Sequence, residues 1–222
     1  MQQEFYEKTL YPLQDRVLRK IEEVNQLFYL SGGTALSRHY LQHRYSDDLD
    51  FFVNQSQAFQ SEVLKNLTHL TTSGFEVEVS VTDTHFVRCF VMEKSVTLKL
   101  EWINDVAYSF GEKTNQKLFH RVDHWQNILS NKLSALGRNE VKDLADILFL
   151  CQKFSFDWPD VVSEAKQKDM WVEEIELSRL IMDAPIESFK AIHWVEQPDF
   201  QQLLVLKERI AEDILEGRRN LA

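Results

Sequence analysis

Hydrophobic positions in the first hundred residues alternate between helical and strand spacing. Leu13, Val17, Ile21 and Val24 recur every three or four residues, which predicts an amphipathic helix over residues 12–25. Similar spacing predicts two more helices, over residues 34–43 and 57–72. Short apolar runs predict two strands, over residues 27–31 and 49–53. Three more runs, rich in Val, Phe and Thr with period-two alternation, predict strands over residues 75–82, 85–92 and 95–103.

From about Asn104 onward the pattern is helical. Asp123 with Gln126, and Asp199 with Gln202, have the spacing of capping boxes and predict the starts of two helices. Three helices are expected between them, over residues 140–153, from residue 157, and over residues 173–183. We therefore predict an α+β fold, with a small mixed-sheet core and an N-terminal helix in residues 1–104. An all-helical domain is expected in residues 105–222.

Composition narrows the class of protein. The 222 residues carry a formal charge of −10 and 44% are hydrophobic, which indicates an ordered globular chain and argues against a generic nucleic-acid binder. Two cysteines make neither a disulfide framework nor a zinc site unaided, and acids lie in the first turns, unlike in a secretory signal. No apolar run reaches the roughly 18 residues of a membrane span. We expect a soluble, cytoplasmic protein with no membrane segment.

One stretch of this acidic chain is basic. Residues 113–142 contain six Lys or Arg residues and two Asp or Glu residues. The six are Lys113, Lys117, Arg121, Lys132, Arg138 and Lys142. The stretch is either a phosphate-binding surface or a solvated charged one.

The segment Leu30–Val53, LSGGTALSRHYLQHRYSDDLDFFV, carries the most informative chemistry. Gly32 and Gly33 end a strand and open a helix, where free backbone N–H groups and the helix dipole attract anions. The turn is therefore either a phosphate cradle or a purely structural turn. It is neither a P-loop nor a dinucleotide fingerprint, because the lysine and the third glycine of those motifs are missing.

Three carboxylates are candidates for binding a metal ion. Asp48 and Asp50 are two residues apart at the start of a strand, so both point to one side, and paired carboxylates suit Mg²⁺. Glu101 shares a strand face with Lys99 and would add a third acid, completing a two-metal clamp for phosphoryl transfer. The structural alternatives are a polar turn at the aspartates and a solvated Lys–Glu face on the second strand.

The helical half adds a lysine and two acids in unusual positions. Lys132 falls within the apolar stripe of its helix, so it either extends to the rim or reaches a cleft. Asp143 and Asp146 lie together on the next helix, opposite its apolar face. Lys132 either contacts substrate directly or pairs with Asp143 or Asp146 and joins the two helices.

Together these residues resemble the nucleotidyltransferase superfamily with the minimal core fold, and most of all the AbiEii/AbiGii toxin type. The matching motifs are Gly32-Gly33-Thr34-Ala35-Leu36, Arg44-Tyr45-Ser46-Asp47-Asp48-Leu49-Asp50, Lys99-Leu100-Glu101, Lys132 and Asp143-Leu144-Ala145-Asp146. The order and spacing of the first two motifs are specific. The chain departs from the family pattern in having Glu101 where Asp is usual. It also has no acid shortly before Lys132 on the same helix.

The resemblance implies a metal-dependent nucleotidyltransferase that moves a nucleoside monophosphate from an NTP to an acceptor hydroxyl. It implies a nucleotidyltransferase core and a helical domain that closes the nucleotide cleft. Asp48, Asp50 and Glu101 would hold Mg²⁺ or Mn²⁺ and, with Lys132, would be the catalytic residues. The implied nucleotide-binding residues are Gly32, Gly33, Thr34, Arg44, Ser46, Lys99, Asp143 and Asp146.

The toxin resemblance also suggests an acceptor and a partner. The acceptor would be the 3′ end of a tRNA, and a cognate antitoxin would restrain the enzyme in a toxin–antitoxin or abortive-infection system. Two alternatives stay open from the residues themselves. The acceptor is a small molecule or a protein, or the chain is a non-catalytic nucleotide-binding module.

Overall fold

The computed structural model describes residues 2–222, whose contacts separate into two compact units. The first unit contains the chain up to Tyr40 together with Tyr45–His124. The second contains Leu41–Arg44 together with Trp125–Ala222. A four-residue piece of the N-terminal half therefore belongs with the C-terminal helices.

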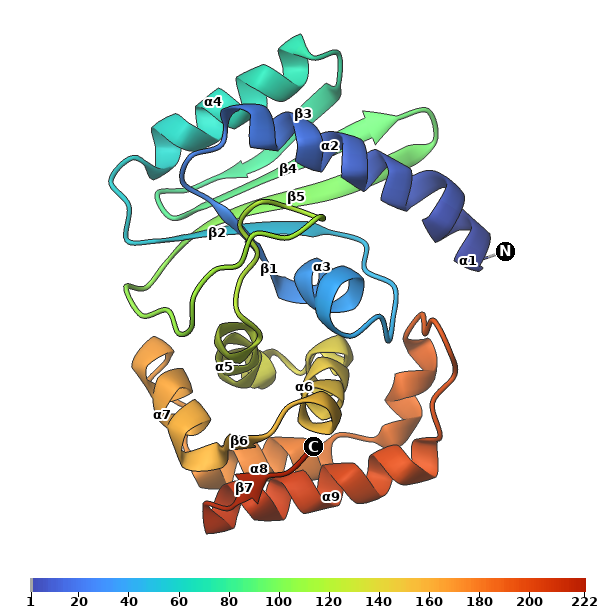
Figure 1. Cartoon of the computed structure of the whole chain (residues 1–222), viewed down its shortest axis with the longest axis vertical. Helices are drawn as coiled ribbons and strands as arrows, with labels where there is room; N and C mark the ends of the chain where they lie inside the picture. Colours follow the sequence, from blue (N-terminus) through green and yellow to red (C-terminus); the bar gives the residue numbers. More distant parts are fainter. Residues whose placement is uncertain (1) are drawn as a thin grey trace. The chain divides into compact units, whose positions relative to one another are not determined.

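The first unit is built on a five-stranded mixed sheet in the order β1-β2-β5-β4-β3 (Figure 1). β2 and β5 run parallel, and the other neighbouring pairs are antiparallel. The strands are β1 (Tyr29–Ser31), β2 (Leu49–Asn54), β3 (Glu76–Thr82), β4 (Phe86–Glu93) and β5 (Val96–Asp105). The predicted mixed sheet is confirmed, and each strand lies within two residues of its expected bounds.

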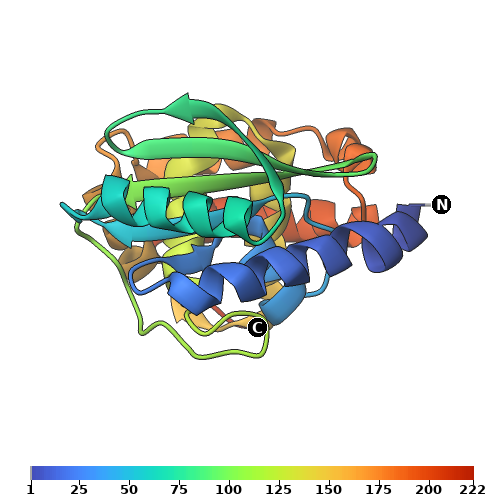
Figure 2. The same ribbon diagram turned by 90° about the horizontal axis from the view of Figure 1, so that it is seen from above.

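Two long helices cover one face of this sheet (Figures 1 and 2). They are α2 (Tyr11–Val24) and α4 (Phe59–Thr72), both predicted from their periodicity. Alternate strand residues such as Phe51, Leu100 and Trp102 are fully buried, as expected where a sheet face packs on helices. The shorter helical segments of the unit are α1 (Gln2–Phe5), η1 (Tyr6–Leu10), α3 (Gly32–Ala35) and η2 (Leu36–Tyr40).

The segment between β5 and the next helix packs along the edge of β1. The Leu30 N–H donates to the Arg121 carbonyl at 2.8 Å, and the Asp123 N–H donates to the Leu30 carbonyl at 2.9 Å. Phe119 and Val122 are fully buried. The contacts therefore group residues 105–124 with the sheet, whereas the sequence pattern predicts a boundary at residues 104/105.

The second unit is almost entirely helical. Its helices are α5 (Trp125–Ala135), η3 (Leu136–Arg138), α6 (Val141–Lys153), α7 (Trp158–Lys168), α8 (Glu174–Asp183), η4 (Ile186–Ala191) and α9 (Phe200–Glu216). The Asp199 carboxylate accepts from the N–H groups of Gln201 and Gln202, which confirms the predicted cap of α9. Two short strands, β6 (Phe156–Asp157) and β7 (Arg219–Asn220), pair antiparallel. The prediction that this half contains only helices was therefore wrong, because it also contains this two-stranded sheet.

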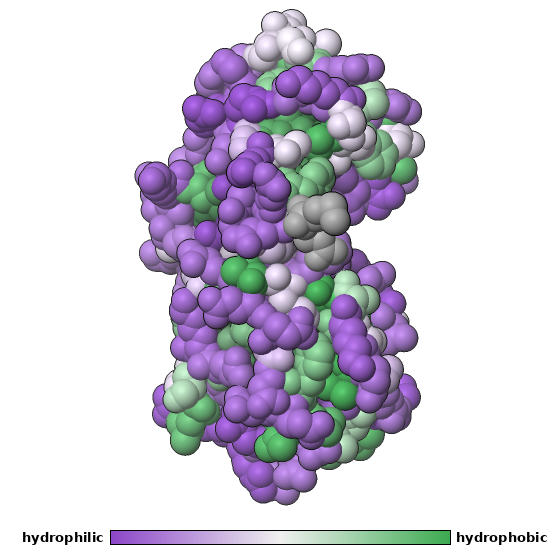
Figure 3. Space-filling model, turned by 90° about the vertical axis from the view of Figure 1, so that its right-hand side faces the viewer, coloured by the Kyte–Doolittle hydropathy of each residue, from purple (hydrophilic) through white to green (hydrophobic). Residues whose placement is uncertain are grey.

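The described surface is mostly polar. On the face drawn in Figure 3, hydrophobic residues form separate small groups between hydrophilic ones. Within residues 2–222, none of the helices combines the length and the apolar character that a membrane crossing requires.

Candidate active site

The predicted glycine turn lies at the end of β1. Gly32 follows Ser31 and adopts a left-handed φ of 66°. A Cβ atom at Gly32 would overlap the carboxylate of Asp50, which lies opposite Ser31 in the β1–β2 pair. Glycine is therefore required both for the backbone conformation and for the close approach of Asp50.

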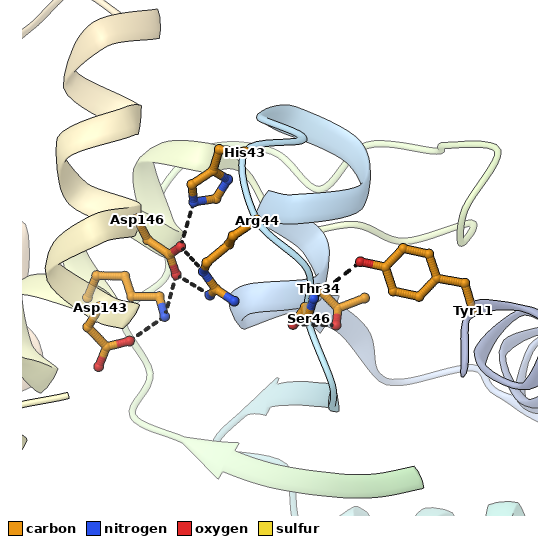
Figure 4. A network of polar contacts seen from close by, with 8 residues as sticks. Tyr11, Thr34, His43, Arg44, Ser46, Asp143 and Asp146 are labelled. Atoms are coloured by element: carbon orange, nitrogen blue, oxygen red, sulfur yellow. Dashed lines mark hydrogen bonds and ion pairs between the residues drawn. The ribbon is translucent and has the colours of Figure 1, made fainter. Parts of the chain in front are cut away.

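Buried hydroxyl groups fix the segment that leads into β2. The hydroxyls of Thr34 and Ser46 lie 3.0 Å apart, and Thr34 also donates to the Asp48 carbonyl. The backbone N–H of Ser46 donates to the Tyr11 hydroxyl at 3.2 Å, as Figure 4 shows. The sequence prediction gives Thr34 and Ser46 a role at nucleotide phosphates. In the structure their side chains hold the segment that carries Asp48.

The carboxylates of the first unit lie on adjacent strands. Asp50 and Glu101 are register partners in the parallel β2–β5 pair, and Arg88 on β4 is the antiparallel partner of Glu101. The Lys99 Nζ lies 2.9 Å from Asp48 Oδ2 and 3.3 Å from Glu101 Oε1. One ammonium group thus bridges the first aspartate and the glutamate, and we call Asp48, Asp50, Lys99 and Glu101 the carboxylate cluster.

The Lys99 ammonium group supplies positive charge inside the carboxylate cluster. Burial lowers the pKa of Lys99, but its hydrogen bond to Asp48 and the charges of the carboxylates outweigh burial and raise that pKa. Among the described residues, no three His, Cys, Asp or Glu side chains are gathered as ligands of one metal ion. Arg88 and Lys99 both hold Glu101 instead. The cluster has the oxygen donors that Mg²⁺ prefers, with an ammonium group bound between two of them.

The other predicted residues form a buried ionic network in the second unit, around the Asp146 side chain. Arg44 donates to both carboxylate oxygens of Asp146 at 2.7 Å, and His43 Nε2 lies 2.9 Å from Oδ1. Lys132 Nζ lies 2.9 Å from Asp146 Oδ2 and also binds Asp143. The exposed fraction of the Asp146 side chain is 0%, so three cationic or hydrogen-bonding groups replace its hydration.

The network fixes the protonation of its members. Burial raises the pKa of Asp146, but the charges of Arg44 and Lys132 and the bonds from His43 and Arg44 outweigh it and hold that pKa well below 3.8. Burial also lowers the pKa of His43. Its Nδ1 has no hydrogen-bond partner within the described chain, so a proton there would be buried unpaired. His43 is therefore neutral at pH 7 and donates through Nε2.

Of the two roles weighed for Lys132, the structure has the pairing with acids on the next helix. Lys132 on α5 binds Asp143 and Asp146 on α6 and joins the two helices. Asp146 is fully buried, and its polar partners come partly from Arg44 and His43. Contacts of Arg44, Lys132, Asp143 and Asp146 with a nucleotide stay predictions.

Arg88 and His43 complete the two groups, and the sequence analysis did not select either. A signal for Arg88 exists in the β4–β5 hairpin, where Glu93 pairs with Val96 around a two-residue turn. Counting outward from that turn places Arg88 opposite Glu101. His43 has no comparable local signal, because Asp146 lies 103 residues away.

Gly32→Ala is expected to lower both stability and activity. The left-handed backbone costs alanine about 1–2 kcal/mol, and the new Cβ displaces the Asp50 carboxylate. Gly74→Ala is the matched control, since Gly74 also has positive φ but nothing within 4 Å of its added Cβ. The unfolding temperature should fall in both variants, and the activity that the resemblance implies should fall in Gly32→Ala alone. Equal activity in the two variants would contradict the role of the turn.

His43 should make the protein less stable in mild acid. Its folded-state pKa lies below the ordinary 6.5, so the unfolded chain binds more protons as the pH falls below that value. The free energy of unfolding should then fall by up to about 1.4 kcal/mol per pH unit from this group. Urea titrations between pH 7.5 and about 5.5 should show a shallower loss for His43→Asn. If the free energy of unfolding fell with pH equally in the protein and in His43→Asn, His43 would not titrate as described.

Comparisons with known proteins agree with the fold. The sequence model of the family "Nucleotidyl transferase AbiEii toxin, Type IV TA system" matches residues 16–213. A crystal structure of a "putative nucleotidyltransferase from H. pylori" superposes with a TM-score of 0.65 at 20% identity, over 95% of this chain and 96% of that one. JHP933 from Helicobacter pylori gives a TM-score of 0.63 at 20% identity, over 92% and 91% of the two chains.

A sequence relative has a shorter match. The uncharacterized protein aq_aa25 of Aquifex aeolicus is 28% identical over 151 residues, which are 64% of this chain and 66% of that protein. The family match, in contrast, extends over most of both units. With its mixed sheet, glycine turn and paired aspartates, this chain belongs to the AbiEii nucleotidyltransferase toxin family and has a nucleotidyltransferase fold.

Proposed function

We propose that this protein transfers a nucleoside monophosphate from an NTP to an acceptor hydroxyl. The observation that carries the proposal is the carboxylate cluster, with Asp50 and Glu101 in register on parallel strands and Asp50 against the Gly32 turn. Family membership supports the same reaction class. These acids beside the Gly32 turn suit phosphoryl transfer, where positioning and charge neutralisation supply most of the catalysis.

Asp48, Asp50 and Glu101 are the proposed metal ligands. They would hold Mg²⁺ or Mn²⁺, which would neutralise charge on the phosphates of the bound NTP. The bridging Lys99 ammonium supports this assignment, because it shows that Asp48 and Glu101 can share one cation. Lys99 would turn to the phosphates once it leaves Asp48.

The remaining residues of the first unit have roles in binding and proton transfer. The backbone N–H groups of Gly32 and Gly33 would bind phosphate oxygens, and Thr34 and Ser46 would keep Asp48 in place. The acceptor oxygen bonds to the α-phosphorus while the bond from that phosphorus to the bridging oxygen breaks, and pyrophosphate leaves with the electron pair. Glu101 takes the acceptor proton.

The acceptor that we propose is an RNA 3′ end, with tRNA as the first candidate. This choice follows the resemblance to the AbiEii/AbiGii toxin type. We also propose an antitoxin partner, because the matched family belongs to Type IV toxin–antitoxin systems. A protein or small-molecule acceptor is the alternative.

Label transfer tests the reaction and sorts the acceptors. The protein is incubated with Mg²⁺, total cellular RNA and each of the four NTPs, labelled at the α- or the γ-phosphate. Label from the α-phosphate alone should enter an RNase-sensitive product. Protease-sensitive or small-molecule products would move the acceptor to another class. No α-label in any fraction of an antitoxin-free preparation would overturn the proposed reaction.

A further inference from the structure

A basic hollow in the first unit lies apart from the carboxylate cluster. Its volume is about 580 Å³, and it is lined from α2, from η2 and from the segment before α5 (Figure 2 shows this segment passing alongside α2). The lining includes Arg19, Arg38, His39, Lys117 and Asp15. Three permanent cations and one acid therefore meet here, in a chain whose formal charge is −10.

Arg38 is held rigidly at this hollow. Its guanidinium donates to Asp15 at 2.6 Å and to Gln14 at 3.1 Å, and its Cζ lies 4.4 Å from the centre of the Tyr11 ring. Only 14% of the Arg38 side chain is exposed. Asp15 thus orients the Arg38 guanidinium, so the hollow contains a cation in a fixed position.

Arg19 and Lys117 add charge that the described part of the chain does not neutralise. The Arg19 Nε donates to the Asp15 backbone carbonyl, and no carboxylate within residues 2–222 pairs with Arg19 or Lys117. Arg19 and Lys117 are both exposed to solvent. A guanidinium and an ammonium group that share a hollow suit the oxygen atoms of a phosphate group.

The rest of the basic stretch does not compete for this role. Lys113 lies 4.4 Å from the centre of the Tyr29 ring, Arg121 donates to the carbonyls of Gln26 and Leu27, and Lys132 is in the buried network. Lys117 is the member of the stretch that lines the hollow. Arg138 and Lys142 lie in the second unit. Within the first unit, the phosphate-binding interpretation of the stretch therefore narrows to Lys117, joined by two arginines from other segments.

We propose that the basic hollow binds a backbone phosphate of the RNA acceptor. The inference rests on the proposed transfer to an RNA end and adds an anchoring site for that RNA. Leu118 is the apolar residue of an otherwise polar lining, and Arg19 and Lys117 are exposed. A pocket for a free nucleotide normally buries the base among apolar side chains, whereas a phosphodiester backbone is bound at an exposed basic surface.

Binding of a fluorescent single-stranded RNA oligonucleotide, without NTP and in EDTA, tests the site. Arg19→Gln with Lys117→Gln should bind about tenfold more weakly near 100 mM salt. The slope of log K against log salt should be smaller by about 1.4, for two lost contacts with a single strand. Arg219→Gln with Lys190→Gln is the matched control, because it removes one exposed Arg and one exposed Lys outside the basic stretch. This control should bind like the original protein.

Two outcomes would overturn the inference. One is equal RNA affinity in the two double variants. The other is loss of ATP binding, measured with the same variants, while RNA affinity is unchanged, which would make the hollow a nucleotide site. Because the assay contains neither metal nor NTP, failure here is distinct from failure of α-label transfer. Thermal unfolding of both double variants checks that each remains folded.

Discussion

Asp146→Ala is expected to lower the free energy of unfolding by about 3–5 kcal/mol. The Asp146 carboxylate is the shared partner of Arg44, Lys132 and His43, and its exposed fraction is 0%. Removing it leaves the Arg44 guanidinium and the Lys132 ammonium group buried without the carboxylate that they share, while Asp143 still pairs with Lys132. Urea denaturation followed by far-UV circular dichroism measures the loss.

Two other aspartates serve as controls for Asp146. Asp143→Ala should cost less, because Lys132 keeps Asp146 and the Asp143 side chain is 14% exposed. Asp183→Ala removes an exposed i,i+4 partner of Arg179 and should change stability by less than about 0.5 kcal/mol. If Asp146→Ala cost no more than Asp183→Ala, the network would not stabilise the second unit.

Asp50→Asn is expected to reduce nucleotide transfer at least about 100-fold. The amide keeps the shape of the side chain against Gly32 but removes the charge that a divalent cation needs. Stability should change little, because Asp50 is only half-buried. Initial rates of α-label incorporation at saturating Mg²⁺ measure the effect.

The control for Asp50 is a carboxylate on the same sheet. Glu78→Gln on β3 makes the same change of charge on an exposed residue and should leave the rate unchanged. A normal rate in Asp50→Asn would exclude the carboxylate cluster as the catalytic centre.

Local periodicity predicts most elements of this fold, because burial on one face imposes alternation on strands and three- to four-residue spacing on helices. It does not place residues 105–124 on the edge of β1. That packing uses a backbone hydrogen bond between Leu30 and Arg121, 91 positions apart in the sequence, and no local pattern carries such a signal.

The site residues also divide into those that local sequence patterns predict and those that depend on distant partners. The i, i+2 spacing predicts that Asp48 and Asp50 point to one side, and strand alternation puts Lys99 and Glu101 on one face. The pairing of Lys132 with Asp143 is local enough to be weighed from the sequence. The burial of Asp146 is not, because its partner Arg44 lies 102 residues away.

Binding of Mn²⁺ in the presence of a non-hydrolysable NTP analogue tests the central claim most directly, because no acceptor is needed. Electron paramagnetic resonance reports the free ion in titrations of the protein and of the double variant Asp48→Asn, Asp50→Asn. The protein should deplete free Mn²⁺ in an analogue-dependent way, and the double variant should not. Equal depletion by both would contradict a metal site at the carboxylate cluster.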